Sequence, residues 1–96
     1  MEVSHKTALV TGAASGIGRA TAVILADSGY RVLCSDISAE GAQKVATWLY
    51  TQGSDAMAVT ADVSDPNAVE AMVQKMIDWT GRLDVVVANA GIMEEG

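Results

Sequence analysis

The chain has 96 residues, half of them hydrophobic, and a formal net charge of −6. This length suffices for one small domain with one core, and the hydrophobic content excludes a disordered chain. The acidic balance argues against a nucleic-acid partner, because nucleic-acid binding requires a basic face.

The sequence also bears on location and on reactive groups. No apolar run approaches the roughly 20 residues that span a bilayer, and residues 1–6 lack the apolar core of a signal peptide. We therefore expect a cytoplasmic protein that does not contact the membrane. Cys34 is the single cysteine, and its apolar neighbours predict a buried, unreactive strand residue. His5 has no partner ligands in the sequence, so we predict no metal site.

The first predicted elements enclose a glycine-rich turn. An apolar run predicts a strand over residues 6–11, and a helix is predicted over residues 16–28, with the sequence TGAASGIG over residues 11–18 joining them. Such a turn brings backbone N–H groups and a helix N-terminus to one point, which suits a phosphate group. We expect Gly12 to turn the chain, Gly16 to let a pyrophosphate lie against the backbone, and Gly18 to bring the helix close to the strand. The predicted buried face of the helix is Ile17, Ala20, Thr21 and Ile24.

A second strand and helix follow. The strand is predicted over residues 31–35, with Asp36 at its C-terminal end. The helix begins at Ser38, a favourable N-cap, and Gly53 is placed to end it. Its predicted buried face is Ala42, Val45, Ala46 and Leu49.

The rest of the chain repeats this alternation. A third strand over residues 55–61 ends at Asp62-Val63, and Asp65-Pro66 gives a cap followed by proline at the first helical position. Gly81 ends that helix, whose predicted buried face is Val69, Met72, Val73, Met76 and Ile77. A fourth strand over residues 83–88 leads into Asn89-Ala90-Gly91.

Four strands alternating with three helices predict an α/β fold with a doubly wound parallel sheet. Right-handed crossovers give the strand order 3-2-1-4. In such sheets a ligand binds at the carboxyl ends of the strands where the order reverses, so the loops after all four strands converge on one crevice.

Asp36 lies eighteen residues after Gly18. A carboxylate at this position can accept hydrogen bonds from both hydroxyls of an adenosine ribose. It would also repel a 2′-phosphate, and positions 15 and 37 hold serine and isoleucine rather than a cation. NAD is therefore favoured over NADP. The alternative is that Asp36 only starts the turn before Ser38.

The later loops offer further contacts. Asp62 can accept from an adenine amino group while the N–H of Val63 donates to the ring; alternatively, Asp62 shapes the next turn with Ser64. The amide of Asn89 can bridge backbone groups of neighbouring strands. The two small residues that follow it, at positions 90 and 91, let a ribose approach the chain.

These motifs, in this order and spacing, resemble the short-chain dehydrogenase/reductase family from about Lys6 to Ile92. The resemblance implies a Rossmann-like fold, NAD(H) binding and oxidation or reduction of a small-molecule alcohol or carbonyl substrate. It also implies a homo-oligomer at full length. The residues predicted to contact the coenzyme are Gly12, Ala14, Ser15, Gly16, Ile17, Gly18, Asp36, Ile37, Asp62, Val63, Asn89, Ala90 and Gly91.

The sequence departs from the family in two ways. Ala88 stands where the family often has asparagine. The family's catalytic Asn, Ser and Tyr-x-x-x-Lys residues lie beyond the Asn-Ala-Gly turn, and Tyr30 and Tyr50 have Cys34 and Ser54 four positions later. We therefore assign no catalytic residue.

Residues 1–96 are accordingly expected to be the N-terminal NAD-binding portion of a single, truncated domain that is inactive by itself. One alternative is a truncated form that acts as a binding or regulatory partner. The other is a methyltransferase, which would leave the glycine turn at 16–18 and the Asn89 loop unexplained because it binds no pyrophosphate.

Overall fold

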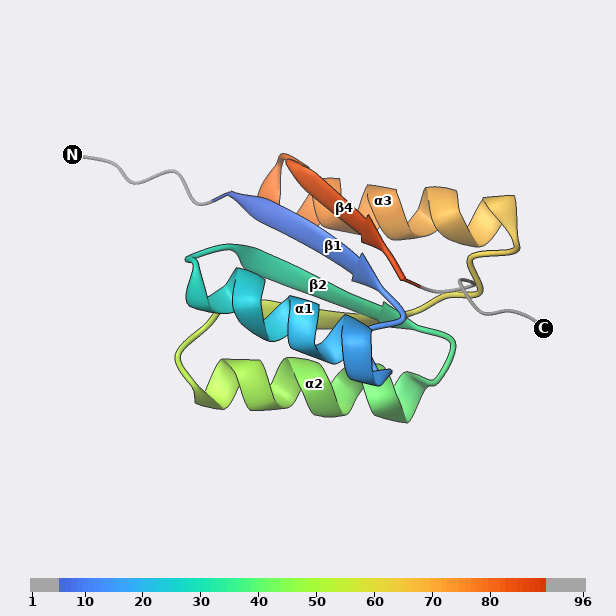
Figure 1. The fold of residues 1–96 in the computed structure, drawn as a ribbon. Helices are drawn as coiled ribbons and strands as arrows, with labels where there is room; N and C mark the ends of the chain where they lie inside the picture. Colours follow the sequence, from blue (N-terminus) through green and yellow to red (C-terminus); the bar gives the residue numbers. More distant parts are fainter. Residues whose placement is uncertain (1–5, 90–96) are drawn as a thin grey trace.

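The computed structural model describes residues 6–89, which form a four-stranded parallel sheet with the strand order β3-β2-β1-β4 (Figure 1). The doubly wound sheet and its predicted order are therefore confirmed. The elements in chain order are β1 (Thr7–Thr11), α1 (Gly16–Asp27), β2 (Arg31–Asp36), α2 (Ala39–Thr51), β3 (Ala56–Thr60), α3 (Pro66–Thr80) and β4 (Val85–Ala88).

Helices α1 and α2 cover one face of the sheet and α3 covers the other (Figure 1). Successive strand residues point to opposite faces, so the two cores alternate along each strand. Val10 and its register partner Cys34 pack with α1 and α2, whereas Leu9 and its partner Leu33 pack with α3. Within residues 6–89, no helix is both long and apolar enough to cross a membrane.

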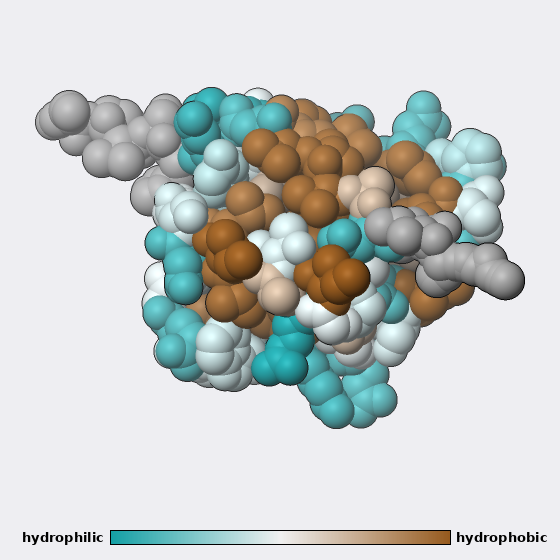
Figure 2. All heavy atoms as spheres, viewed as in Figure 1, coloured by the Kyte–Doolittle hydropathy of each residue, from teal (hydrophilic) through white to brown (hydrophobic). Residues whose placement is uncertain are grey.

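The buried face of α1 differs from the prediction. Ile17 and Ile24 are 73% and 64% exposed, and the buried residues are instead Gly18, Ala22 and Ala26. Small residues fill the closest contact between the helix and the sheet, whereas the larger Val23 and Leu25 are only partly buried against the same core. Apolar residues also gather on this face of the molecule over β4 (Figure 2).

The other two helices follow their predicted faces more closely. The four residues predicted to face the core from α2 are all buried. On α3, Met72 and Met76 are buried and Val69 and Val73 are half-buried, but Ile77 is exposed. The apolar arc of α3 is wider than the surface that the sheet offers, so its margin remains in solvent.

Cys34 lies in the middle of β2 and has no exposed surface. Burial raises the pKa of its thiol to about 12, because the thiolate would have to exist away from water. The prediction of a buried cysteine is confirmed, and a thiol with this pKa is not a nucleophile near neutral pH.

Candidate functional site

The carboxyl ends of the four parallel strands lie along one edge of the sheet (Figure 1). Hydrogen bonds connect the loops that leave this edge. The N–H of Ala13 donates to Ser35 O at 2.9 Å, and the N–H of Ala61 donates to Asp36 O at 3.1 Å. The N–H of Asn89 donates to Thr11 Oγ1 at 3.0 Å. The loops therefore form one connected surface, as the topology predicts.

The glycine-rich turn is closed by its own hydrogen bonds. Gly12 has a φ of +64°, a conformation that side chains other than glycine rarely adopt. Ser15 caps α1: its hydroxyl donates to Gly12 O at 2.7 Å and accepts from Gly18 N at 3.3 Å. These hydrogen bonds fix the conformation of the turn.

Gly16 and Gly18 have opposite surroundings. A Cβ added to Gly18 would overlap the carbonyl oxygen of Gly12, so the close approach of α1 to the end of β1 requires glycine there. A Cβ added to Gly16 would meet no atom within 4 Å among residues 6–89, apart from its own helical turn. The backbone at Gly16 is therefore open to a group from outside the protein, which is the environment that the predicted phosphate contact requires.

Asp36 connects the end of β2 with the glycine-rich turn. Its Oδ2 accepts from the N–H of Ala14 at 3.0 Å, and its Oδ1 accepts from the N–H of Ser38 at 2.9 Å. The alternative that Asp36 starts the turn before Ser38 is thus observed, and the second hydrogen bond ties its carboxylate to the glycine-rich turn. Its contact with a ribose remains a prediction. A carboxylate has about four acceptor positions, so two remain for other donors.

The two isoleucines predicted to contact the coenzyme lie at the surface. Ile17 is 73% exposed in the first turn of α1, where backbone N–H groups have no acceptor within the helix. Ile37 follows Asp36 directly and is 69% exposed. Ile17 is the second residue of α1, and Ile37 lies in the turn between β2 and α2, so both backbones are at the carboxyl edge of the sheet.

Asp62 is engaged in a local turn. Its Oδ1 accepts from the N–H of Ser64 at 2.9 Å and from its hydroxyl at 2.7 Å. The hydrogen bond from the Ser64 hydroxyl, and to a smaller extent the one from its N–H, hold the pKa of the Asp62 carboxyl below its ordinary value. Val63 beside it is half-buried and packs against the core under α3. The turn-forming alternative for Asp62 is thus observed, and its contact with adenine remains a prediction.

Asn89 joins β4 to β1 through its main chain rather than through its amide. The side chain of Thr11 accepts from the N–H of Asn89 and itself donates to Val87 O at 3.4 Å. The buried Nδ2 of Asn89 has no hydrogen-bond partner in the described range. Ala90 and Gly91, also predicted to contact the coenzyme, lie outside the described residues.

Gly41 is a site residue that the sequence analysis missed. A Cβ added there would lie 2.5 Å from the Cβ of Ala14, so the first turn of α2 packs directly on the glycine-rich turn. The available signal was a glycine inside the first turn of a predicted helix, where it costs conformational entropy. A cavity of about 350 Å³ opens beside this contact, lined by Ala14, Arg19, Gly41, Lys44, Val45 and Trp48.

Together these groups fit a ligand that carries a phosphate and a sugar. The turn supplies backbone N–H groups and an open glycine, and Asp36 supplies an acceptor beside them. In the part of the chain that the structure describes, no three His, Cys, Asp or Glu side chains come together to hold a metal ion.

The parallel sheet, its strand order and the glycine-rich turn at this edge define an α/β protein of the Rossmann type. A sequence model of the short chain dehydrogenase family matches residues 6–96, so the chain belongs to that family. Proteins of this family are oxidoreductases that generally use NAD(P). Family membership also decides against the methyltransferase alternative.

Two curated relatives and one solved structure illustrate the match. The chain is 48% identical to the cis-4-hydroxycyclohexanecarboxylate dehydrogenase of Sinomonas cyclohexanicum, covering 95% of this chain and 36% of that protein. It is 45% identical to the versicolorin reductase of Emericella nidulans, covering 95% of this chain and 35% of that protein. A hydroxysteroid dehydrogenase structure from Escherichia coli superimposes with a TM-score of 0.87 at 35% identity, covering 90% of this chain and 37% of that one. The chain thus spans little more than a third of these relatives.

Proposed function

We propose that this chain binds NAD(H) and is the coenzyme-binding part of an oxidoreductase that interconverts an alcohol and a carbonyl compound. The observation that carries the proposal is the 3.0 Å hydrogen bond between Asp36 Oδ2 and the N–H of Ala14. It brings an acceptor suited to ribose hydroxyls against a turn suited to phosphates, and a dinucleotide needs both.

The pyrophosphate would lie against the start of α1. The backbone there offers N–H groups at Gly16 and Ile17, which belong to the first helical turn. The helix dipole adds a partial positive charge at this end. Because no other element of the described chain would meet a Cβ on Gly16, the space beside its backbone can receive a phosphate oxygen.

The adenosine ribose would lie over Asp36, whose carboxylate has acceptor positions beyond the two hydrogen bonds it already accepts. A 2′-phosphate would bring like charge against this carboxylate, and neither Ser15 nor Ile37 supplies a cation to offset it. These groups favour NAD over NADP. Asp62 and Val63 would contact the adenine ring from the next loop.

The nicotinamide, when bound, supplies the hydride acceptor or donor. The residues of this chain bind and orient the coenzyme, and Asn89 and its two successors would border the ribose next to the nicotinamide. Neither tyrosine has a lysine four positions later, so we propose that residues 1–96 alone do not carry out the oxidoreduction. Turnover of an alcohol by this chain alone would contradict that part of the proposal.

The direct test is a titration of the chain with NADH, followed by coenzyme fluorescence and by the shift in unfolding midpoint that a bound ligand produces. We expect saturable binding. Absence of any change at millimolar NADH would refute the proposed function.

Asp36→Ala tests the residue that carries the proposal. Losing a hydrogen bond to a charged group costs about 1.5–3 kcal/mol, so the NADH Kd should rise at least about tenfold while the NADPH Kd changes little or falls. The matched control is Asp27→Ala, which removes the same charge from an exposed position at the far end of α1. An unchanged preference between the coenzymes in Asp36→Ala would remove Asp36 from the site.

A further inference from the structure

The outer side of β4, which faces away from β1, has no neighbouring strand among residues 6–89. The order β3-β2-β1-β4 places β4 last in the sheet, where it pairs with β1 only. Figure 1 shows this outer side at the end of the sheet away from α2. The last strand of an open sheet presents a row of unpaired N–H and C=O groups, which can receive a further strand.

The side chains of β4 are apolar and uncovered. The strand has the sequence VVVA over Val85–Ala88, and none of its four residues is buried, whereas all five residues of β1 are. Val86 is 55% exposed. Helix α1 packs on β1 and β2, and α2 packs on β2 and β3. Apolar atoms gather over β4 (Figure 2), so exposed apolar side chains and unpaired backbone groups coincide there.

The charges around β4 do not protect its outer side. Strands at the end of a sheet usually carry a charged residue or a proline that discourages pairing with another chain, and β4 has neither. Asp84 precedes the strand, but its carboxylate accepts from the N–H of Thr7 and pairs with Arg82. The whole chain has a formal net charge of −6. Two copies therefore repel each other least where both present this uncharged strand.

A copy of the same strand fits the outer side of β4. Antiparallel strands pair without a crossover, so two copies of β4 related by a two-fold axis can exchange backbone hydrogen bonds. A parallel neighbour needs a crossover of about a dozen residues, and these 96 residues contain only positions 90–96 after Asn89. We propose that a second copy of the 96-residue chain occupies the outer side of β4, joining two four-stranded sheets into one continuous sheet in a two-fold dimer.

Sedimentation equilibrium of the 96-residue chain tests the dimer directly. A four-residue strand gives a small contact, so we expect a weak monomer–dimer equilibrium. Raising the ionic strength from about 0.05 M to about 0.5 M should tighten it, because salt screens the repulsion between two acidic chains. A monomer at millimolar concentration would overturn the proposal. Assemblies that grow beyond the dimer would overturn the two-fold arrangement, which closes on itself.

Val86→Lys tests the location of the contact. In an antiparallel pair of so short a strand, the two copies of residue 86 lie close to the two-fold axis. Two lysines there repel each other, so the dimer Kd should rise at least about fivefold. The matched control is Ile24→Lys, which changes the net charge equally at a residue that is 64% exposed on α1, and its Kd should change less than about twofold. Equal weakening by both variants would indicate general apolar association and would overturn the proposal.

A mixture of Val86→Lys and Val86→Glu tests the pairing itself. Each variant alone should be mainly monomeric, whereas equal amounts of the two should form a mixed dimer, because opposite charges then face each other across the strands. Denaturant unfolding checks that both variants fold. If both are folded and the mixture does not associate, the two strands do not face each other.

Hydrogen exchange of the unmodified chain provides a measurement that needs no variant. Backbone amides of β4 should exchange more slowly as the chain concentration rises, whereas those of β3 should not change. Dimerisation without added protection of β4 would place the contact elsewhere and overturn the proposal. This inference does not depend on coenzyme binding, so a failed NADH titration would leave it standing.

Discussion

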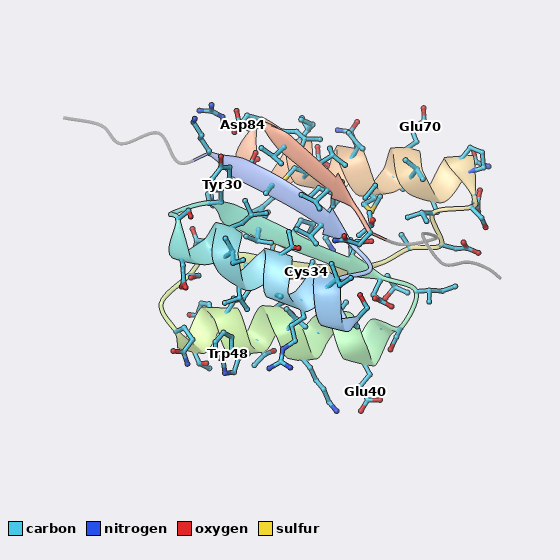
Figure 3. All side chains as sticks on the ribbon, viewed as in Figure 1. Tyr30, Cys34, Glu40, Trp48, Glu70 and Asp84 are labelled. Atoms are coloured by element: carbon cyan, nitrogen blue, oxygen red, sulfur yellow. The ribbon has the colours of Figure 1, made fainter. Side chains whose placement is uncertain are left out.

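The two ends of the parallel strands differ in how their charged groups are held. We call the side where the strands begin the amino edge and the side where they end the carboxyl edge. At the amino edge the charges pair with each other: Arg82 Nη2 lies 2.8 Å from Asp84 Oδ1, and Arg31 Nε lies 3.1 Å from Asp55 Oδ2. Arg31 also lies over the ring of Trp79, 5.0 Å from its centroid. Figure 3 shows Asp84 at the end of the sheet away from Glu40, which lies at the start of α2.

At the carboxyl edge the acids are held by neutral donors instead. Asp36 accepts from two backbone N–H groups, and Asp62 accepts from the N–H and hydroxyl of Ser64. Over the described residues, neither carboxylate has a cationic partner.

At the amino edge, Arg31 pairs with Asp55 before β3, and Asp84 also accepts from the N–H of Thr7 in β1, so these charges hold neighbouring strands together. At the carboxyl edge, the two acids have neutral donors and no counter-ion within residues 6–89. This difference is the one expected between a stabilising edge and the proposed binding edge.

The largest expected effect on stability comes from a steric clash at the carboxyl edge. Gly18→Ala places a methyl group on the carbonyl oxygen of Gly12, which forces α1 away from β1. We expect a loss of about 3 kcal/mol in the free energy of unfolding, the upper end for overpacking, because backbone atoms cannot move aside as a side chain would. Chemical denaturation measures this loss, and NADH binding should be lost with it.

Gly16→Ala is the matched variant. In the part of the chain that the structure describes, the added methyl group meets no other element. Alanine is also the better helix former, so the variant should be at least as stable as the unmodified chain. NADH affinity should nevertheless fall, because the methyl group occupies the proposed phosphate position. Normal NADH binding by Gly16→Ala would show that the phosphates lie elsewhere.

A smaller effect is expected where α2 meets the glycine-rich turn. In Gly41→Ala the new methyl group meets the Cβ of Ala14 at 2.5 Å and Ser38 Oγ at 3.1 Å, so the start of α2 must shift outward. The gain in helix propensity offsets part of the strain, and we expect a net loss of about 1 kcal/mol. A thermal unfolding series measures it. A variant with raised stability would mean that the two loops are less tightly packed than the structure has them.

The smallest expected effect is a change in how stability depends on pH, caused by Asp84 at the amino edge. The side chain of Arg82 and the N–H of Thr7 hold the pKa of the Asp84 carboxyl below its ordinary value. A lowered pKa in the folded state means that the unfolded chain takes up the proton first. The stabilisation is therefore complete above about pH 4 and is lost as the pH falls through the folded-state pKa.

Asp84→Asn should flatten the dependence of stability on pH between neutral and acid conditions, measured by denaturant unfolding. The matched control is Asp62→Asn, whose carboxyl also has a lowered pKa but contacts a residue only two positions away. Asp84 joins residues 77 positions apart, so its variant should also lose more stability at pH 7. Equal losses at pH 7 would contradict the structural role assigned to the amino edge.

The order of the strands and the start of the helices could be predicted because local signals agree with the global fold. Ser38 and Asp65 cap their helices as expected, with hydrogen bonds of 3.0 Å to Gly41 N and Asn67 N. The glycine spacing and Asp36 likewise predicted that the loops converge at the carboxyl edge of the sheet. Each of these features depends on residue type at one position and on its neighbours in sequence.

The buried face of α1 could not be predicted in the same way. Its sequence contains bulky apolar residues on one side and small ones on another, and periodicity alone favours burying the bulky side. The small side is buried instead, because α1 lies close to the sheet. That distance depends on the contact of Gly18 with Gly12. The cavity bordered by Arg19 and Lys44 was hidden for the same reason, since it depends on how two helices pack.

The two hydrogen bonds that Asp36 accepts have a consequence for attempts to redesign coenzyme preference. The acid proposed to contact the ribose also ties the loop after β1 to the loop before α2. A variant made there to change the proposed coenzyme preference should therefore also loosen the two loops. Its stability has to be measured beside its affinity before any change in preference is assigned to the carboxylate alone.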